Sequence, residues 1–546
     1  MILNYIILVL SLISLFGFSI LIKRFIFYSE NNYKQIYDYD LFLGLMPVFI
    51  ITFIFNIFFP LKYLTELFFL VGILIFIYFR KEIKLNRKII QFFGILFSIV
   101  FITYNSYTVY DTNLYHLQIL NWNSFYKLNF GLSNLEIRFG TNSFWQLVLS
   151  IFNNPKYNVQ YLYIFNCIPI AVLINQFNSI TLKEVKLSFI YIFCCINFIL
   201  LFSILHSSNN GLILNSLRSP EVDTVAMFFL IFSVYFFLKY FEDFKYQDYV
   251  YCFIFSCLAA ITKISHIGTL LLPISIFFLT KLKFNRVQLI CFILFLIWLT
   301  KSFILSGCWL FPVSFTCFPS FFWSTPIEEI KLYSNIVSSY PRAHSAGMSF
   351  MNFDYTLNSF KWFYPWVKTY FLSTSFTVIF LIVSIISILF IFLKTFLEKK
   401  NIQFKKIFYI LIIFYIFNFY VWFNAPELRY GYGIFISLSC LLFSYAFKSF
   451  INKLELISKF KYLPIFFLLI LVSQNYKNIN FLNNVNKIIF DNSKIKLHKK
   501  VNGITFYKSN AKHGFCNDFK MPCIIYPKKI NNKKYTGYNF FYRDNK

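Results

Sequence analysis

The sequence predicts an all-α polytopic membrane protein with about fourteen transmembrane helices and a small β-rich tail on the outside. Of 546 residues, 58% are hydrophobic and only 13% are charged, and the mean hydropathy is +0.63. Soluble domains carry about 25% charged residues, so the class of water-soluble globular enzymes is excluded. Apolar segments long enough to approach a membrane span recur as far as residue 474.

Each predicted span is a stretch of mostly apolar residues between polar connections. These stretches are residues 4–22, 42–60, 64–79, 90–104, 159–178, 187–206, 222–240, 248–262, 266–280, 287–305, 370–393, 407–423, 430–447 and 462–474. The first stretch has no charged leader and no small-residue cleavage site, so we expect a retained span. Residues 141–153 (TNSFWQLVLSIFN) are too short to cross, and we expect them to form an amphipathic helix at the membrane interface.

The basic residues set the expected orientation. With the N-terminus outside, the inside loops hold about twice as many Lys and Arg residues as the outside loops. This distribution matches the excess of basic residues in cytoplasmic loops. The tail after residue 474 is also rich in Lys and Arg but falls outside, because long tails cross largely regardless of their charge.

Three parts follow from these segments. A transmembrane body covers residues 1–474, and two outside loops, 105–158 and 306–369, lie within it. Residues 475–546 alternate short β-like runs with Asn- and Lys-rich turns. We expect this last part to be a small domain outside the cytoplasm.

The positions of four cysteines and the net charge lead to two further predictions. Cys308 and Cys317 lie in one outside loop, and Cys516 and Cys523 lie in the tail. Short-range pairs on the same side are typical of disulfides in an oxidising compartment, although free thiols remain the alternative. The net charge of +29 reflects basic loops, and no nucleic-acid-binding motif is present, so no nucleic-acid partner is expected.

Acidic and histidine side chains gather in the predicted outside connections. Asp111 and His116 lie in the first large loop, and Glu221 and Asp223 enter the seventh span. Ionisable residues at a membrane edge are costly and tend to be functional, so these four are the candidate catalytic residues. Asp111 could instead cap a helix, the two acids after Pro220 could interact with a helix dipole, and His116 could be a buried interface residue.

Basic side chains lie in the same connections and could bind an anionic substrate. They are Arg138, Arg218, Lys263 and Arg429. Arginines near span ends can also anchor lipid phosphates. If they form one anion site, Asp111, Arg218, Glu221 and Arg429 should line a common cavity.

Several of these segments resemble a known group of enzymes. The order of spans and the Asp-bearing first outside loop resemble the GT-C superfamily of polytopic glycosyltransferases. The sequences DTNLYHLQ (111–118), GLSNLEIRFGTNS (131–143), SGCWLFP (306–312), APELRYG (425–431) and CNDFKMPC (516–523) are similar to an uncharacterised family of large bacterial inner-membrane proteins linked to surface polysaccharide.

The resemblance implies a function. A GT-C-like enzyme would transfer a sugar from a polyprenyl-phosphate donor to a cell-envelope glycan or lipid acceptor at the outer face of the bacterial inner membrane. Asp111 would be the acid of the first loop, as base or as partner of a divalent metal (Mg or Mn), and the basic residues would hold the lipid phosphate. Asp111 is followed by Thr112 instead of a second acid, so Glu221 or Asp223 would supply that acid.

Other functions remain open. Arg342 and His344 in the sequence YPRAH are compatible with an O-antigen-type polymerase or ligase. A non-enzymatic carrier of lipid-linked oligosaccharides or a structural assembly subunit are further alternatives. The carrier would require charged residues in mid-membrane, and the predicted spans contain almost none.

Overall fold

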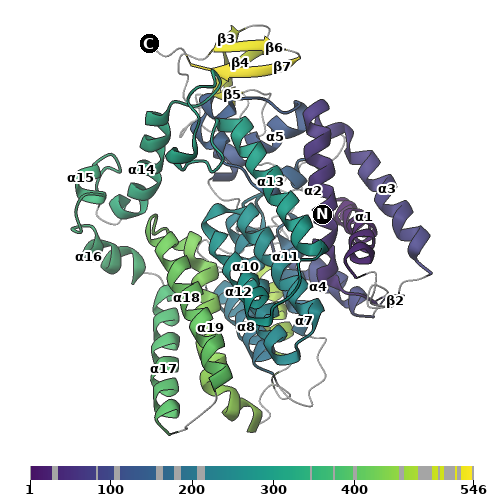
Figure 1. Ribbon diagram of the computed structural model, residues 1–546, viewed down its shortest axis with the longest axis vertical. Helices are drawn as coiled ribbons and strands as arrows, with labels where there is room; N and C mark the ends of the chain where they lie inside the picture. Colours follow the sequence, from purple (N-terminus) through teal and green to yellow (C-terminus); the bar gives the residue numbers. More distant parts are fainter. Residues whose placement is uncertain are drawn as a thin grey trace.

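The protein is a mostly helical bundle with short strands at its C-terminal end (Figure 1). The computed structural model describes residues 2–27, 35–81, 84–85, 87–103, 111–154, 164–177, 186–205, 216–344, 347–372, 375–397, 402–453, 460, 462–476, 495–501, 504–509, 523–524, 531–535 and 537–543.

Long apolar helices form the body. They are α1 (Ile2–Ile26), α2 (Leu41–Phe58), α3 (Thr65–Phe79), α4 (Arg87–Thr103), α7 (Cys167–Phe177), α8 (Leu187–Leu205), α10 (Asp223–Asp243), α11 (Tyr246–Thr262), α12 (Leu271–Thr280), α13 (Arg286–Ser306), α17 (Ser375–Leu397), α18 (Ile402–Phe423), α19 (Leu428–Lys453) and α21 (Leu463–Tyr476). All fourteen predicted spans overlap one of these helices.

Among the described residues, six helical segments are long and apolar enough to cross a membrane. They are Asn4–Ile26, Asp38–Phe58, Leu187–Ile204, Asp223–Asp243, Arg286–Ser306 and Leu428–Lys453. Seven further apolar segments, such as Thr65–Phe79 and Ile407–Phe423, are shorter. Large apolar side chains on α3, α13, α17 and α18 are exposed, which suits contact with lipid. This pattern indicates a membrane protein.

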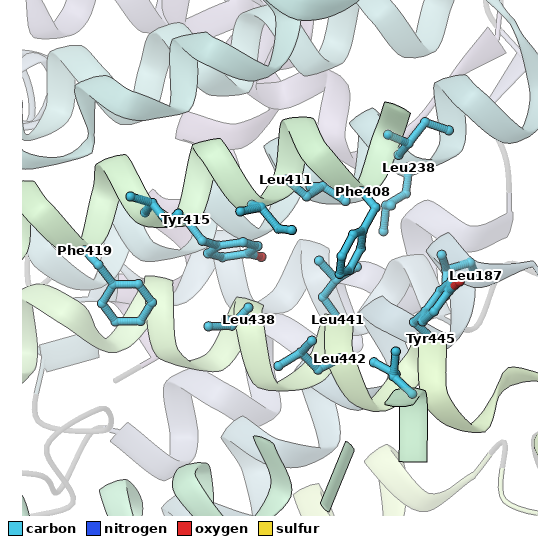
Figure 2. Close-up of a pocket in the computed structure, with 14 residues that line it drawn as sticks. Leu187, Leu238, Phe408, Leu411, Tyr415, Phe419, Leu438, Leu441, Leu442 and Tyr445 are labelled. Carbon is cyan, nitrogen blue, oxygen red and sulfur yellow. The ribbon is translucent and has the colours of Figure 1, made fainter. Parts of the chain in front are cut away.

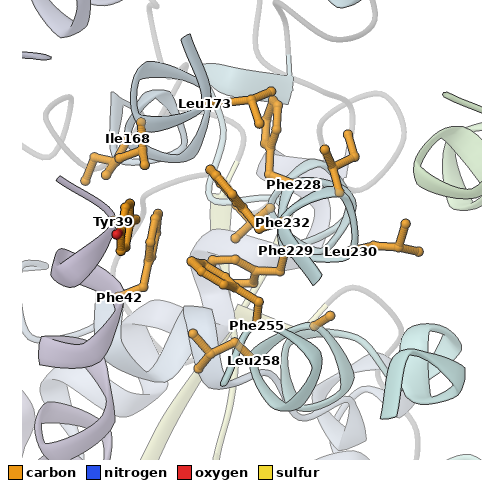
Figure 3. Close-up of a cluster of buried hydrophobic side chains, with 14 of the residues drawn as sticks. Tyr39, Phe42, Ile168, Leu173, Phe228, Phe229, Leu230, Phe232, Phe255 and Leu258 are labelled. Atoms are coloured by element: carbon orange, nitrogen blue, oxygen red, sulfur yellow. The ribbon is translucent and has the colours of Figure 1, made fainter. Parts of the chain in front are cut away.

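The centre of the bundle is α10, which is surrounded by other helices. It packs against α8, α11 and α19, and nearly all of its side chains are buried. Figure 3 shows Phe228, Phe229 and Phe232 of α10 with Phe42 of α2 and Phe255 of α11. Interlocked aromatic rings of this kind bury a large apolar area, so they hold α2, α10 and α11 together.

Glycines allow α1, α2 and α3 to cross closely. A Cβ atom on Gly17 would lie 2.0 Å from the carbonyl oxygen of Gly72, and one on Gly44 would lie 2.2 Å from that of Leu15. Small residues are typical of close helix contacts in membranes. These three helices therefore form a tight N-terminal unit beside the central helices.

Shorter elements connect the helices at the end of the bundle where α10 and α19 begin. They include the π-helix η4 (Thr112–His116), α5 (Leu117–Phe125), η6 (Ile137–Gly140), α6 (Phe144–Leu149), η8 (Ile264–Leu270) and α14 (Ile327–His344). The predicted interfacial helix at 141–153 is wrong, because every residue of α6 is buried. Helix α14 is amphipathic and has an exposed face.

The tail contains strands, as the sequence predicts. They are β3 (Ile495–Val501), β4 (Ile504–Ser509), β5 (Cys523–Ile524), β6 (Asn531–Tyr535) and β7 (Tyr538–Tyr542), arranged as a sheet of order β3-β4-β5 and the antiparallel hairpin β6-β7. Phe541 of β7 is fully buried beside Trp122 and Leu132, and Arg543 forms an ion pair with Glu329 of α14. The hairpin therefore lies at the same end of the bundle as these loops.

Candidate functional site

Five of the eight predicted site residues form one ionic cluster, which we call the Arg429 cluster: Asp111, Glu221, Asp223, Lys263 and Arg429. Their positions follow from helix ends. Asp111 immediately precedes η4, Glu221 and Asp223 lie at the start of α10, Lys263 follows the last residue of α11, and Arg429 is the second residue of α19.

Arg429 is the centre of the cluster. Its Nη2 lies 2.7 Å from Asp111 Oδ2, its Nη1 lies 4.0 Å from Glu221 Oε1, and its Nε lies 3.8 Å from Asp223 Oδ2. Lys263 Nζ forms an ion pair with Asp223 Oδ1 and lies 3.4 Å from the centre of the Tyr430 ring. Segments far apart in the sequence thus bring three acids and two cations together.

Helix electrostatics explain only part of this arrangement. The first turn of α10 favours the carboxylate of Asp223, because a helix N-terminus carries partial positive charge. The same effect disfavours the Arg429 guanidinium at the N-terminus of α19. The three carboxylates, not the helix, therefore account for the position of Arg429.

The cluster is open on one side. The side chains of Asp111 and Arg429 are 15% and 28% exposed, whereas that of Glu221 is 2% exposed. Glu221 Oε2 has no hydrogen-bond partner among the described residues. A ligand could thus reach Asp111 and Arg429 first, while Glu221 lies behind them.

Burial changes the proton affinity of the deep acid. Burial and, next, the negative charge of Asp223 raise the pKa of Glu221 above its usual range, and Arg429 opposes this shift only in part. With Glu221 neutral, the two aspartates face the two cations Lys263 and Arg429, and the cluster has no net charge. A buried acid that keeps its proton near neutral pH can donate or accept one during a reaction.

His116 lies directly behind the acids. Its Nδ1 forms a 2.6 Å hydrogen bond with Gln146 Nε2, and the same amide donates to the Pro220 carbonyl at 3.4 Å. Burial lowers the pKa of His116 to about 4, so the imidazole is neutral at pH 7. These contacts tie η4 to α6 and to the start of α10, which is a positioning role.

Asp111 is followed by the π-helical turn η4, which holds its position in the site. π-helical turns are rare and frequent at functional sites. Thr112 Oγ1 is hydrogen-bonded to Ser219 Oγ, which joins this turn to the segment that carries Glu221. The segments with Asp111 and Glu221 are therefore held side by side independently of Arg429.

Arg138 and Arg218 are the other two predicted anion-binding residues. Arg138 Nε forms an ion pair with Glu136 Oε1 at 2.8 Å, and its guanidinium lies 5.4 Å from the ring centre of Tyr115. Arg218 is buried in the turn before Pro220, on the segment that leads to Glu221 and Asp223. The role of Arg218 as a phosphate-binding residue therefore stays a prediction.

The structure adds residues that the sequence did not single out. The ring of Tyr430 lies next to both cations of the cluster, and Gln146 links His116 to the start of α10. The position of Tyr430 directly after Arg429 is a signal for its role, because cations often pack on aromatic rings. Gln146 gave no such signal, because the segment around it resembles an amphipathic helix.

Two predictions concern cysteines. Cys308 and Cys317 are joined by a disulfide, which closes the loop after α13. Cys516 lies outside the described residues, so the pairing with Cys523 stays a prediction. Within the described part of the chain, the other cysteines are free and lie in or at apolar helices.

The acids do not fit a divalent metal ion in this arrangement. No group of three or more His, Cys, Asp or Glu side chains that could hold a metal ion occurs among the described residues. Asp111 and Asp223 are each paired with a cation, and this cation takes the place that a metal ion would need.

An apolar cavity of about 250 Å³ lies away from the cluster, between α18 and α19 (Figure 2). Its lining residues include Phe408, Tyr415 and Phe419 of α18 and Leu438 and Leu441 of α19. It shares no residue with the Arg429 cluster. We therefore do not include it in the candidate site.

Fold and cluster together define a helical membrane protein with a partly exposed ionic site at one end of its helices. The model of the family described as "Domain of unknown function (DUF8201)" matches residues 1–436. The chain belongs to this family, and the matched region includes every residue of the Arg429 cluster. No curated protein and no solved structure matches the chain.

Proposed function

We propose that this protein is a membrane glycosyltransferase that moves a sugar from a polyprenyl-phosphate donor to a cell-envelope glycan or lipid acceptor on the outer face of the bacterial inner membrane. The observation that carries the proposal is the pairing of Asp111 with Arg429 at a helix end, with Glu221, Asp223 and Lys263 around them. In this proposal the body has about fourteen spans and resembles GT-C enzymes.

The site has the groups that the reaction requires. The acceptor hydroxyl oxygen attacks the anomeric carbon, the bond from this carbon to the phosphate oxygen breaks, and the lipid phosphate leaves with the bonding electrons. Asp111 takes the hydroxyl proton. Arg429 and Lys263 stabilise the charge that develops on the leaving phosphate, and this stabilisation is larger in the transition state than in the ground state.

The partial exposure of the pair matters for this mechanism. Arg429 is bonded to Asp111 in the present state, so an anionic donor would compete with Asp111 for the guanidinium. Binding of the lipid phosphate would release the Asp111 carboxylate for the acceptor. The neutral form of Glu221 limits the negative charge that an incoming phosphate meets.

The polymerase or ligase alternative gains no support from Arg342. Its guanidinium donates hydrogen bonds to the carbonyl oxygens of Thr356, Phe423 and Asn424 and lies 4.7 Å from the ring centre of Trp362. These contacts hold α14 to the end of α18. Arg342 is thus engaged in structure, and we keep the transferase as the proposed function.

The deciding experiment uses purified protein with a defined polyprenyl-phosphate monosaccharide and a glycan acceptor. Asp111→Asn should abolish transfer while the circular dichroism spectrum and the thermal unfolding temperature stay near those of the parent. Asp354→Asn is the matched control, because Asp354 is exposed and contacts Asn358 in an outer loop.

Each other result counts against the proposal. Full transfer by the Asp111→Asn variant would overturn the role of Asp111. Block-wise transfer from a diphosphate-linked glycan, with no use of the monosaccharide donor, would favour a polymerase or ligase. Accessibility of a cysteine at position 111 from the cytoplasmic side only would remove the outer-face placement.

A further inference from the structure

Lys301 is a buried lysine near the end of a membrane-spanning helix. Lys301 is 2% exposed. It lies in α13 just before the last turn of the helix, and that last turn contains no basic residue. Lysines near span ends normally extend their ammonium group to the membrane surface. The side chain of Lys301 remains inside the protein instead.

Lys301 has no counter-charge in the described structure. No hydrogen bond or ion pair involves its Nζ among the described residues, and no carboxylate acts on it. A buried charge without a partner is strongly unfavourable. Either the ammonium loses its proton, or a bound group supplies the missing negative charge.

The surroundings of Lys301 favour a bound group. Lys301 lines a small cavity together with Trp122 and Ser143. The Trp122 indole Nε1 and the Ser143 Oγ are buried, and neither has a hydrogen-bond partner among the described residues. An ammonium and an indole N–H can only donate, so the open groups of this cavity are mainly donors.

The other polar side chains of the cavity are already satisfied. Asn123 Nδ2 donates to Ser150 Oγ, and Thr141 Oγ1 donates to the Arg138 carbonyl oxygen. The cavity measures about 10 Å³, which is close to the smallest volume that holds one water-sized particle. The donor set suits one small anion, and an anion larger than water would need the lining side chains to move slightly apart.

We propose that Lys301, Trp122 and Ser143 form a binding site for a single small monovalent anion, with chloride as the physiological candidate. The anion accepts hydrogen bonds from the three side chains and balances the charge of Lys301. It also joins α13 to α5 and to the segment 139–143, which follows Arg138. This site is independent of the proposed transferase activity.

The test measures thermal unfolding of the full-length protein in detergent as chloride replaces gluconate at constant ionic strength. We expect the unfolding temperature of the parent to rise and then saturate, because a ligand that binds only the folded state stabilises it by mass action. Lys301→Met should lose this dependence. Lys331→Met, which removes an exposed lysine of α14, should keep it.

A second measurement protects the test if Lys301→Met fails to fold. In chlorine-35 NMR, the parent protein should broaden the chloride signal, and added bromide should reverse this broadening by competition. A parent unfolding temperature that does not depend on chloride would overturn the proposal and leave a neutral amine with a water molecule. An equal chloride dependence in Lys301→Met would also overturn it.

Discussion

Two ionic clusters lie at opposite ends of the central helices, and they differ in how completely they are satisfied. The Arg429 cluster lies where α10 begins. The second, which we call the Asp40 cluster, consists of Lys23, Asp38, Asp40 and Tyr251 and lies where α2 begins. Tyr251 belongs to the first half of α11, whereas Lys263 follows the end of this helix.

The Asp40 cluster is closed and fully bonded. The side chains of Lys23 and Asp40 are 1% and 0% exposed, with Nζ and Oδ2 2.5 Å apart. Asp40 also accepts hydrogen bonds from the Tyr37 backbone N–H and the Tyr251 hydroxyl. Both carboxylate oxygens of Asp38 accept hydrogen bonds, from Asn175 and from Gln176.

The Arg429 cluster differs in two respects. Asp111 and Arg429 are partly exposed, and Glu221 Oε2 lacks a partner among the described residues. A fully satisfied buried network specifies a fold, whereas an incompletely satisfied one calls for an explanation such as a ligand or a reaction. The comparison therefore indicates a structural role for the Asp40 cluster and favours the Arg429 cluster as the candidate functional site.

The largest expected effect is the loss of protein stability when the Asp40 cluster is broken. Asp40→Asn leaves the Lys23 ammonium buried without a negative partner, and breaking a buried pair in this way costs about 3–5 kcal/mol. We expect a corresponding loss of unfolding free energy, measured by denaturant titration in detergent.

The ion pair between Lys186 and Asp243, the last residue of α10, provides the control. The Lys186 side chain is 47% exposed, so Asp243→Asn should cost less than about 1 kcal/mol. Equal stability losses in the two variants would contradict the structural role of the Asp40 cluster.

The next effect is on the activity of the Arg429 cluster. Arg429→Gln removes the guanidinium that would face the leaving phosphate, and loss of one such group lowers turnover by about 10²–10³-fold. The stability should change less than in Asp40→Asn, because Asp111 can turn to solvent and Lys263 still balances Asp223. Sugar transfer and unfolding should be measured on the same preparation.

Arg286→Gln is the matched control, because Arg286 is an exposed arginine at the start of α13 that bonds to the Phe25 carbonyl. Its variant should transfer sugar at the parent rate. If Arg429→Gln keeps its activity but loses as much stability as Asp40→Asn, the two clusters have the same structural role, and the comparison fails.

The sequence predicts the helices well because their signal is local. A run of apolar residues must be buried in lipid or protein wherever it lies, so all fourteen predicted spans overlap helices of the structure. Helix lengths depend on neighbours, and only six described segments meet the length of a full span. The ionic partners at the helix ends are non-local, so residue types could nominate Asp111 and Arg429 but could not show that these two side chains pair.

Residues 141–153 show why a local pattern can mislead. Gln146 and Ser150 lie one helical turn apart and give the segment a polar stripe, which is typical of an interfacial helix. In the structure this stripe faces polar groups inside the protein, since Gln146 bonds to His116 and Ser150 accepts from Asn123. Periodicity identifies a polar face but not what that face contacts.

The smallest expected effect concerns the pH dependence of stability behind the Arg429 cluster. Burial lowers the pKa of His116 from 6.5 to about 4. Between these values the unfolded chain binds a proton that the folded protein excludes, so stability is full above about pH 6.5 and falls as the pH drops towards 4. This group contributes at most about 3 kcal/mol to the loss.

His116→Asn should flatten the acid side of the stability profile, because the amide oxygen can still accept a hydrogen bond from Gln146 but the side chain no longer titrates. His344→Asn, which changes an exposed histidine of α14, is the control, and its stability profile should equal that of the parent. Unfolding temperatures between pH 4 and pH 7 separate the two variants. An unchanged acid slope in His116→Asn would mean that water reaches the imidazole, so that the Arg429 cluster is open behind its acids as well as in front of them.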